Sequence, residues 1–113
     1  MNTKQLIHLF HILIVGGLLL YVGINREKIP KKMFPLLFVL GLVIILYHSY
    51  KTYNYMSTGK RFWINLIHVL IIGPLLVYIG YYKEKTSRKF FEMLLMLGFA
   101  SIGYHSYYLF QSK

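Results

Sequence analysis

The chain has 113 residues, of which 57% are hydrophobic and only 14% are charged, and it contains no cysteine. A soluble domain of this length leaves much of its surface in water and could not bury so many apolar side chains, so the composition predicts a membrane protein. The net charge is +10. Because the cations lie between apolar runs, we assign them to membrane topology and anionic lipid headgroups, and we exclude nucleic acid as a partner.

Four apolar segments are long enough to cross a bilayer. The first, at about 6–24, spans roughly 28 Å as a helix, close to the ~30 Å of bilayer hydrocarbon. We expect the other helices at about 33–50, 62–81 and 90–110. Two tight basic loops at 25–32 and 82–89 and a longer polar connection at 51–61 separate them. The Gly73-Pro74 pair is expected to kink the third helix. The corresponding positions of the first helix are Gly16-Gly17, without a proline, so we expect the two halves of the chain to differ in shape at these positions.

The second half of the chain repeats the first at an offset of 57 residues without a gap. Half of the positions between 11 and 50 are identical in the second copy, and Tyr47-His48-Ser49-Tyr50 returns as Tyr104-His105-Ser106-Tyr107. Such a match indicates a tandem duplication. We therefore predict two two-helix repeats, 1–54 and 55–113, folded as pseudo-symmetric helical hairpins within one all-α four-helix bundle. A two-helix unit keeps its orientation, so the copies form a parallel repeat.

The orientation follows from the distribution of the cations. Four spans place both termini on one side, and the two tight loops carry more Lys and Arg than the opposite side. The positive-inside rule then places loops 25–32 and 82–89 in the cytoplasm, and the termini and the histidines described next outside or in a lumen. The expected partners are the bilayer itself and anionic headgroups at these loops.

Two histidines recur in each repeat. They are His11 and His48 in the first copy and His68 and His105 in the second. Helical rise places all four roughly 5–9 Å below the outer interface, so we predict one layer of four imidazoles. His8 and its counterpart Asn65 are interpreted as interfacial residues without a special role.

Helical spacing assigns faces to these segments. We expect His48 to end an interior stripe with Phe34, Leu37, Gly41 and Ile45, which recurs as Phe91, Leu94, Gly98, Ile102 and His105. The expected stripe of the first helix is His11, Ile14, Leu18 and Tyr21, and its copy is His68, Ile71, Leu75 and Tyr78. Gly16 and Gly23 lie on another face, which suits contact with a neighbouring helix.

The first interpretation of the histidine layer is a site for haem b or a transition-metal ion, used in electron transfer. Imidazole is the commonest biological metal ligand, and two histidines from facing helices can be axial ligands to a haem. Gly41 and Gly98 would leave room for a flat macrocycle. The cations of the outer side, Lys51 and Arg61 among them, would meet the propionates.

Two alternatives stay open. Intramembrane ionisable residues are functional candidates by default, so the layer could relay protons or ions with Tyr21, Tyr47, Tyr78 and Tyr104 as polar steps. A pore would require a homo-oligomer, because one copy is a thin, dry bundle. The other alternative is a structural protein in which the histidines hydrogen-bond with neighbours such as Ser49 and Ser106. No nucleotide-binding or hydrolase motif is present, so we do not expect an enzyme.

Overall fold

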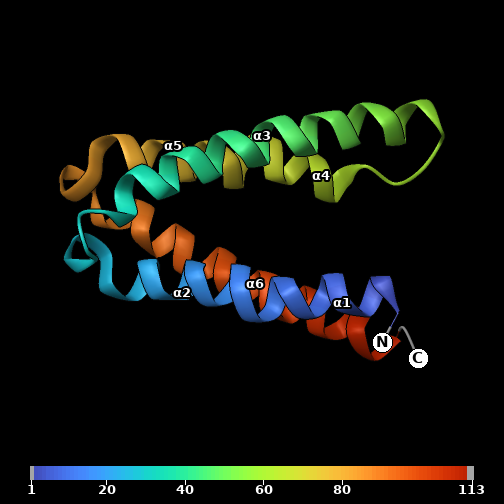
Figure 1. Cartoon of the computed structure of the whole chain (residues 1–113), viewed down its shortest axis with the longest axis horizontal. Coiled ribbons are helices and arrows are strands. Elements are labelled where there is room, and N and C mark those ends of the chain that lie inside the picture. The colour runs from blue at the N-terminus through green and yellow to red at the C-terminus, as the bar shows by residue number, and fades with distance from the viewer. Residues whose placement is uncertain (1, 112–113) are drawn as a thin grey trace. The chain divides into compact units, whose positions relative to one another are not determined.

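A computed structural model describes residues 2–111, and this part of the chain is all-α, as predicted (Figure 1). In the first half, the elements are α1 (Thr3–Phe10), the π-helical turn η1 (His11–Val15), α2 (Gly16–Asn25), the 3-10 turn η2 (Arg26–Lys28) and α3 (Met33–Ser57). In the second half, they are α4 (Trp63–Ile67), the π-helical turn η3 (His68–Ile72), α5 (Gly73–Tyr82), the 3-10 turn η4 (Lys83–Lys85) and α6 (Arg88–Gln111). Since α1, η1 and α2 follow one another without a gap, as do α4, η3 and α5, the described chain forms four long helical segments.

Three of these segments are long and apolar enough to cross a membrane, and they indicate an integral membrane protein. They are Thr3–Lys28, Met33–Ser57 and Trp63–Lys85. Helix α6 is not among them, so the fourth predicted span stays a prediction. Its 24 residues would measure about 36 Å. However, Arg88, Lys89 and Glu92 in its first turns and the polar residues near its end lower its hydropathy.

The second helix is longer than predicted, because the connection expected at 51–61 is helical up to Ser57. The segment contains no glycine or proline before Gly59, so nothing stops the helix earlier. Thr52 and Ser57 donate their hydroxyl protons to the carbonyl oxygens four residues back, at 2.6 and 2.9 Å. Gly59 then adopts a φ of 72°, and the N–H of Lys60 donates to the Tyr55 carbonyl at 2.9 Å. This is the usual way in which a left-handed glycine ends a helix.

The helices pair across the two repeats rather than within them. One compact unit consists of the N-terminal helical segment and α6, and we call it the terminal unit. The other covers Glu27–Thr86 and pairs α3 with α5, and we call it the central unit. The predicted pairing of neighbouring helices into hairpins within 1–54 and within 55–113 is therefore not the observed pairing. The limits of the duplicated segments themselves stay a prediction.

Glycines explain this pairing. A Cβ built on Gly23 would lie 2.7 Å from the Leu95 Cα, and a Cβ built on Gly80 would lie 2.5 Å from the Phe38 nitrogen. Both helix pairs are thus in backbone contact where a side chain is missing, as small residues permit in membranes. Gly80 follows Gly23, and Leu95 follows Phe38, at the 57-residue offset. The same helix contact is built twice. The predicted contact role of Gly16 and Gly23 is confirmed, since Gly16 also lies against α6, where it meets the Ile102 side chain.

The interior stripes of α3 and α6 are confirmed at their first three positions, while Ile45, His48 and Ile102 are half-buried. The stripe of the first helix is not confirmed. Phe34, Leu37 and Gly41 are buried, and so are their copies Phe91, Leu94 and Gly98. In the first helix, by contrast, Ile14 is 58% exposed and Tyr21 is 42% exposed. The turn η1 lies inside that predicted stripe, and a π-helical turn holds an additional residue, so the spacing of an α-helix no longer keeps the stripe on one face. Leu19, Val22 and Gly23 are buried instead.

Candidate functional site

In the terminal unit, three histidines form one cluster. The rings of His11 and His105 are stacked, with centroids 4.4 Å apart and an interplanar angle of 22°. The Nδ1 atoms of His8 and His105 lie 2.8 Å apart, which is a hydrogen-bond distance. Tyr108 stacks on His8 with centroids 6.1 Å apart. His105 is buried, so the side chain at the centre of this cluster is shielded from solvent.

The central unit holds an equivalent cluster with two histidines. The rings of His48 and His68 are stacked with centroids 4.1 Å apart, again at 22°. The His48 Nδ1 lies 2.7 Å from the Asn65 Oδ1, to which it donates. Asn65 is only 6% exposed. A buried amide needs a hydrogen-bond partner, and His48 provides one.

The 57-residue offset relates the two clusters, with one chemical exchange. His11 corresponds to His68 and His105 to His48, while His8 corresponds to Asn65. The structure therefore brings the four predicted histidines together as two stacked pairs, one in each unit. The predicted single layer of four stays a prediction.

The backbone fixes the orientation of one ring in each pair. The Nδ1 of His11 donates to the carbonyl oxygen of Ile7 at 2.8 Å, and the Nδ1 of His68 donates to that of Ile64 at 2.7 Å. In the neutral ring, this bond leaves the lone pair on Nε2. Both rings are thus held in the same tautomer.

Each anchored histidine begins a π-helical turn. The N–H of Gly16 donates to the His11 carbonyl, and the N–H of Gly73 donates to the His68 carbonyl. The expectation that the two halves differ in shape here is wrong, because both copies form the turn although only one has a proline. Pro74 is the second residue of α5 and directly follows the π-helical turn within the continuous helical segment. Such turns are frequent at functional sites.

The space beside the two predicted haem-pocket glycines is filled by the partner helix. A Cβ on Gly41 would lie 2.7 Å from the Gly73 carbonyl oxygen, and a Cβ on Gly98 would lie 3.0 Å from the Leu20 Cδ2. In this arrangement, both glycines serve helix contact.

The other predicted site residues divide into two groups. Tyr47 and Tyr104 each present an edge-to-face contact to the next residue's imidazole, at 5.1 and 5.0 Å. The Lys51 Nζ lies 5.5 Å from the Tyr47 ring centroid. The remaining predicted residues have other surroundings. Tyr21, Ser49 and Arg61 are exposed, Ser106 is half-buried, and Tyr78 packs on Tyr82 with ring centroids 4.6 Å apart.

No group of three or more His, Cys, Asp or Glu within residues 2–111 is placed to hold a metal ion. The stacked rings also differ from two axial haem ligands, which approach the iron from opposite sides of the macrocycle. Ligation of haem or a metal by His11, His48, His68 and His105 therefore stays a prediction, and it would require the rings to turn.

Two residues of the clusters were assigned no role from the sequence, namely His8 and Asn65. Both lie three residues before an anchored histidine, and they occupy equivalent positions in the two copies. This equivalence was the available signal. His8 and Asn65 are different polar side chains, and each lies about one helical turn before a histidine that recurs in both copies. A polar residue kept at this position suggests that its side chain hydrogen-bonds within the histidine cluster.

Comparisons with protein families, with curated proteins and with solved structures gave no match. Fold and site together define a small α-helical integral membrane protein with two related histidine clusters.

Proposed function

We propose that this protein binds and releases protons at its two histidine clusters as a step in proton transport across a membrane. The observation that carries the proposal is the 2.8 Å distance between the Nδ1 atoms of His8 and His105. One nitrogen must donate and the other accept, so the two rings share a proton. Gain of one further proton strengthens this hydrogen bond, because a cationic donor bonds more tightly than a neutral one.

A second positive charge in the same cluster is opposed. Two cationic imidazoles would both present Nδ1–H groups and could not form the bond, and His11 lies stacked against His105 at 4.4 Å, where like charges repel. In this proposal the cluster takes up at most one extra proton at a time, with several rings to receive it. Histidine is the side chain that exchanges protons near neutral pH, which suits a relay.

A polar path beyond the clusters is the further requirement. Leu19 and Leu94 in the terminal unit and Leu37 in the central unit are buried on the paired faces below the histidines. One copy therefore offers an apolar interior, and we propose that the path forms between copies of the chain in a homo-oligomer. Buried water at such a contact would complete the relay.

The membrane topology belongs to the same proposal. Helix α6 lies along the N-terminal segment from the Gly23–Leu95 contact to the His8–His105 contact. A helix that packs along a membrane-spanning segment from one of these contacts to the other crosses the same part of the bilayer as that segment. We therefore propose that α6 is the fourth span. The cations of loops 25–32 and 82–89 support a cytoplasmic position for these loops and an outer or lumenal position for the clusters.

Proton flux into liposomes tests the proposal. The purified chain is reconstituted with a pH-sensitive dye inside, and a potassium gradient with valinomycin drives proton entry. We expect flux that falls to the rate of empty liposomes in His105→Gln and His48→Gln. The control is Tyr53→Phe at an exposed position of α3, for which we expect native flux. Native protein that adds no flux, or histidine variants that keep it, would contradict the proposal.

A second candidate function is binding of haem or a transition-metal ion with electron transfer. The observation that favours it is the hydrogen bond from each of His11 and His68 to a backbone carbonyl. Metal-ligating histidines almost always donate their other N–H in this manner, which places the lone pair on Nε2. An absorption spectrum and elemental analysis of the purified protein test it. A Soret band or a stoichiometric metal that is lost in His11→Ala and His68→Ala would support this candidate, and a colourless, metal-free protein would exclude it.

A further inference from the structure

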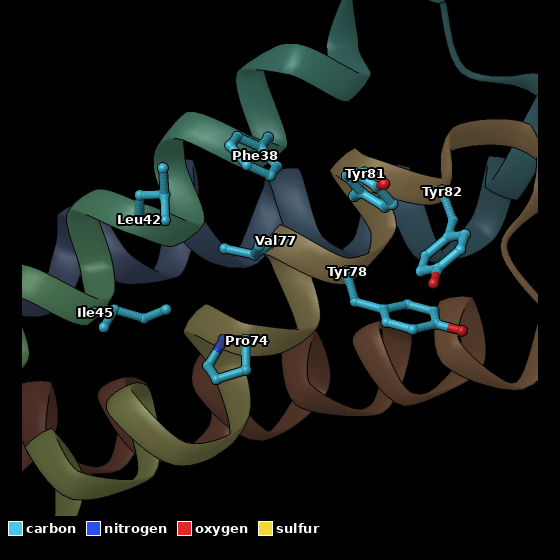
Figure 2. Close-up of a pocket in the computed structure, with 8 residues that line it drawn as sticks. All are labelled: Phe38, Leu42, Ile45, Pro74, Val77, Tyr78, Tyr81 and Tyr82. Carbon is cyan, nitrogen blue, oxygen red and sulfur yellow. The ribbon is translucent and has the colours of Figure 1, made fainter.

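The central unit contains an apolar cavity of about 380 Å³ between α3 and α5, a size typical of ligand pockets. Figure 2 shows its lining, with the tyrosines toward one end and Ile45 and Pro74 toward the other. The lining residues are Phe38, Leu42, Ile45, Pro74, Val77, Tyr78, Tyr81 and Tyr82. Both helices belong to segments that are apolar enough to cross a membrane. A lipid acyl chain is therefore a ligand whose chemistry suits this cavity.

The tyrosine end of the cavity lies beside positive charge. Helix α5 ends at Tyr82, and the turn η4 follows directly with two cations, Lys83 and Lys85, and one anion, Glu84. Helix α3 begins at Met33, directly after Lys31 and Lys32. The two helix ends lie together, because Gly80 packs against Phe34 and Phe38. Tyrosine and lysine at the end of a span mark the headgroup level of a bilayer.

We propose that this cavity binds an anionic phospholipid. One acyl chain lies along Leu42, Ile45 and Pro74, and the phosphate meets Lys83 and Lys85. The apolar lining requires an apolar chain, and the cations at its mouth favour a negative headgroup over a zwitterionic one. The rings of Tyr78 and Tyr82, tilted by 41° with centroids 4.6 Å apart, form the wall between these two parts.

The duplication provides an internal comparison for this site. At the 57-residue offset, Pro74 corresponds to Gly17, Tyr81 to Ile24 and Tyr82 to Asn25. Leu42 corresponds to the bulkier Phe99. The terminal unit therefore has neither the proline nor the paired tyrosines at the equivalent place, and a larger side chain replaces Leu42. We assign the lipid site to the central unit alone, and it does not depend on the histidine chemistry.

Brominated lipids, which quench tryptophan on contact, test the site in the full-length chain. Trp63, the one native tryptophan, is replaced in Trp63→Phe, and Tyr78→Trp places a reporter in the cavity wall. The matched reporter is Tyr21→Trp at the equivalent position of the first copy. Each is reconstituted in phosphatidylcholine vesicles that contain either brominated phosphatidylglycerol or brominated phosphatidylcholine at the same mole fraction.

At the Tyr78→Trp reporter, we expect the relative binding constant of brominated phosphatidylglycerol to exceed that of brominated phosphatidylcholine by about five-fold for each lysine in contact with the headgroup. At the Tyr21→Trp reporter, we expect no such preference. Lys83→Gln with Lys85→Gln should remove the preference, and Leu42→Phe should lower quenching by both lipids because it fills the cavity. Equal quenching by the two lipids at Tyr78→Trp, or a preference that survives both lysine substitutions, would overturn the proposal.

Native mass spectrometry of the unsubstituted chain gives an independent measurement. Protein extracted from vesicles of equal phosphatidylglycerol and phosphatidylcholine should retain phosphatidylglycerol, and Lys83→Gln with Lys85→Gln should retain less. Retention of both lipids in equal amounts would contradict an anionic lipid site, whatever the reporters show.

Discussion

The Nδ1 atoms of His8 and His105 lie 2.8 Å apart, while Asn65, the counterpart of His8, accepts a hydrogen bond from His48 at 2.7 Å. An amide oxygen accepts a proton only as a hydrogen bond and does not take it up near neutral pH. His48 therefore keeps its proton on Nδ1, whereas the Nδ1 of His105 can either donate to His8 or accept from it, with the accepting ring carrying its own proton on Nε2. The two clusters differ in proton chemistry by this one substitution.

The first prediction concerns this exchange. In His8→Asn, the terminal cluster acquires the polar partner of the central one. We expect His105 to change from a mixture of tautomers to a single Nδ1–H form, because the new amide should turn its oxygen toward the ring nitrogen, as Asn65 does toward His48. The ¹⁵N chemical shifts of the imidazole nitrogens, measured in detergent micelles at neutral pH, report the tautomer directly.

The reciprocal variant is the matched control. In Asn65→His, we expect His48 to lose its single tautomer and to show the averaged ¹⁵N shifts of the native His105. If His105 gives the same shifts in the native chain and in His8→Asn, the two rings do not share a proton.

The sequence was sufficient to predict the class of structure and to single out the four histidines that the structure brings together as stacked pairs. Apolar runs and their lengths predict helices, and the repeat predicts that His11 and His68, like His48 and His105, occupy equivalent places. The pairing of the helices was not predictable in this way. By length alone, a helix can pair with the next helix of its own repeat or with a helix of the other repeat. Which pair forms depends on close approaches such as that of Gly80 to Phe38.

The faces of the first helix show a second limit. Spacing arguments assume one helical period, and η1 changes that period directly after His11. Residues 12–15 contain no proline or polar side chain that would indicate a π-helical turn, so the exposure of Ile14 and Tyr21 could not be foreseen. The roles of His8 and Asn65 depend on the same geometry, since the rings they contact come from distant parts of the chain.

The second prediction tests the helix contacts. A methyl group added in Gly80→Ala meets the Phe38 backbone nitrogen at 2.5 Å, and one added in Gly23→Ala meets the Leu95 backbone at 2.7 Å. Backbone cannot yield as a side chain does, so we expect each variant to lose about 1–3 kcal/mol of unfolding free energy. Thermal unfolding in detergent, followed by circular dichroism, measures the loss.

Gly17→Ala is the control for this pair, because no atom lies within 4 Å of the added methyl. Alanine is the better helix former by up to about 1 kcal/mol, so Gly17→Ala should be neutral or stabilising. Similar destabilisation by all three substitutions would show that the helix contacts are not the cause.

The third prediction concerns backbone strain at the ends of α2 and α5. Arg26 and Lys83, equivalent in the repeat, both adopt a φ of 55°, with ψ at −128° and −131°. A non-glycine residue in such a region destabilises the folded state by about 1–3 kcal/mol. Glycine relieves this strain, but it loses more backbone entropy on folding, which offsets about 0.5–1 kcal/mol of the gain. We expect Lys83→Gly to raise the unfolding temperature, and Lys85→Gly, which removes the same charge from η4, to leave it unchanged or lower. Equal shifts in the two variants would contradict strain at Lys83.

The last prediction concerns the number of spans and uses the absence of cysteine from the native chain. Because there is no background thiol, single cysteines at Asn2, Lys31, Ser87 and Gln111 report their side of the membrane by reaction with an impermeant maleimide. Four spans place Asn2→Cys and Gln111→Cys on one side, and Lys31→Cys and Ser87→Cys on the other. Three spans, with α6 outside the bilayer, would leave Gln111→Cys on the same side as Ser87→Cys. We expect the four-span pattern, because α6 contacts the N-terminal segment from Leu95 to His105 and a helix outside the bilayer could not follow a spanning helix over that length. In intact cells, labelling of Asn2→Cys and Gln111→Cys but not of Lys31→Cys would also place the histidine clusters toward the outer side.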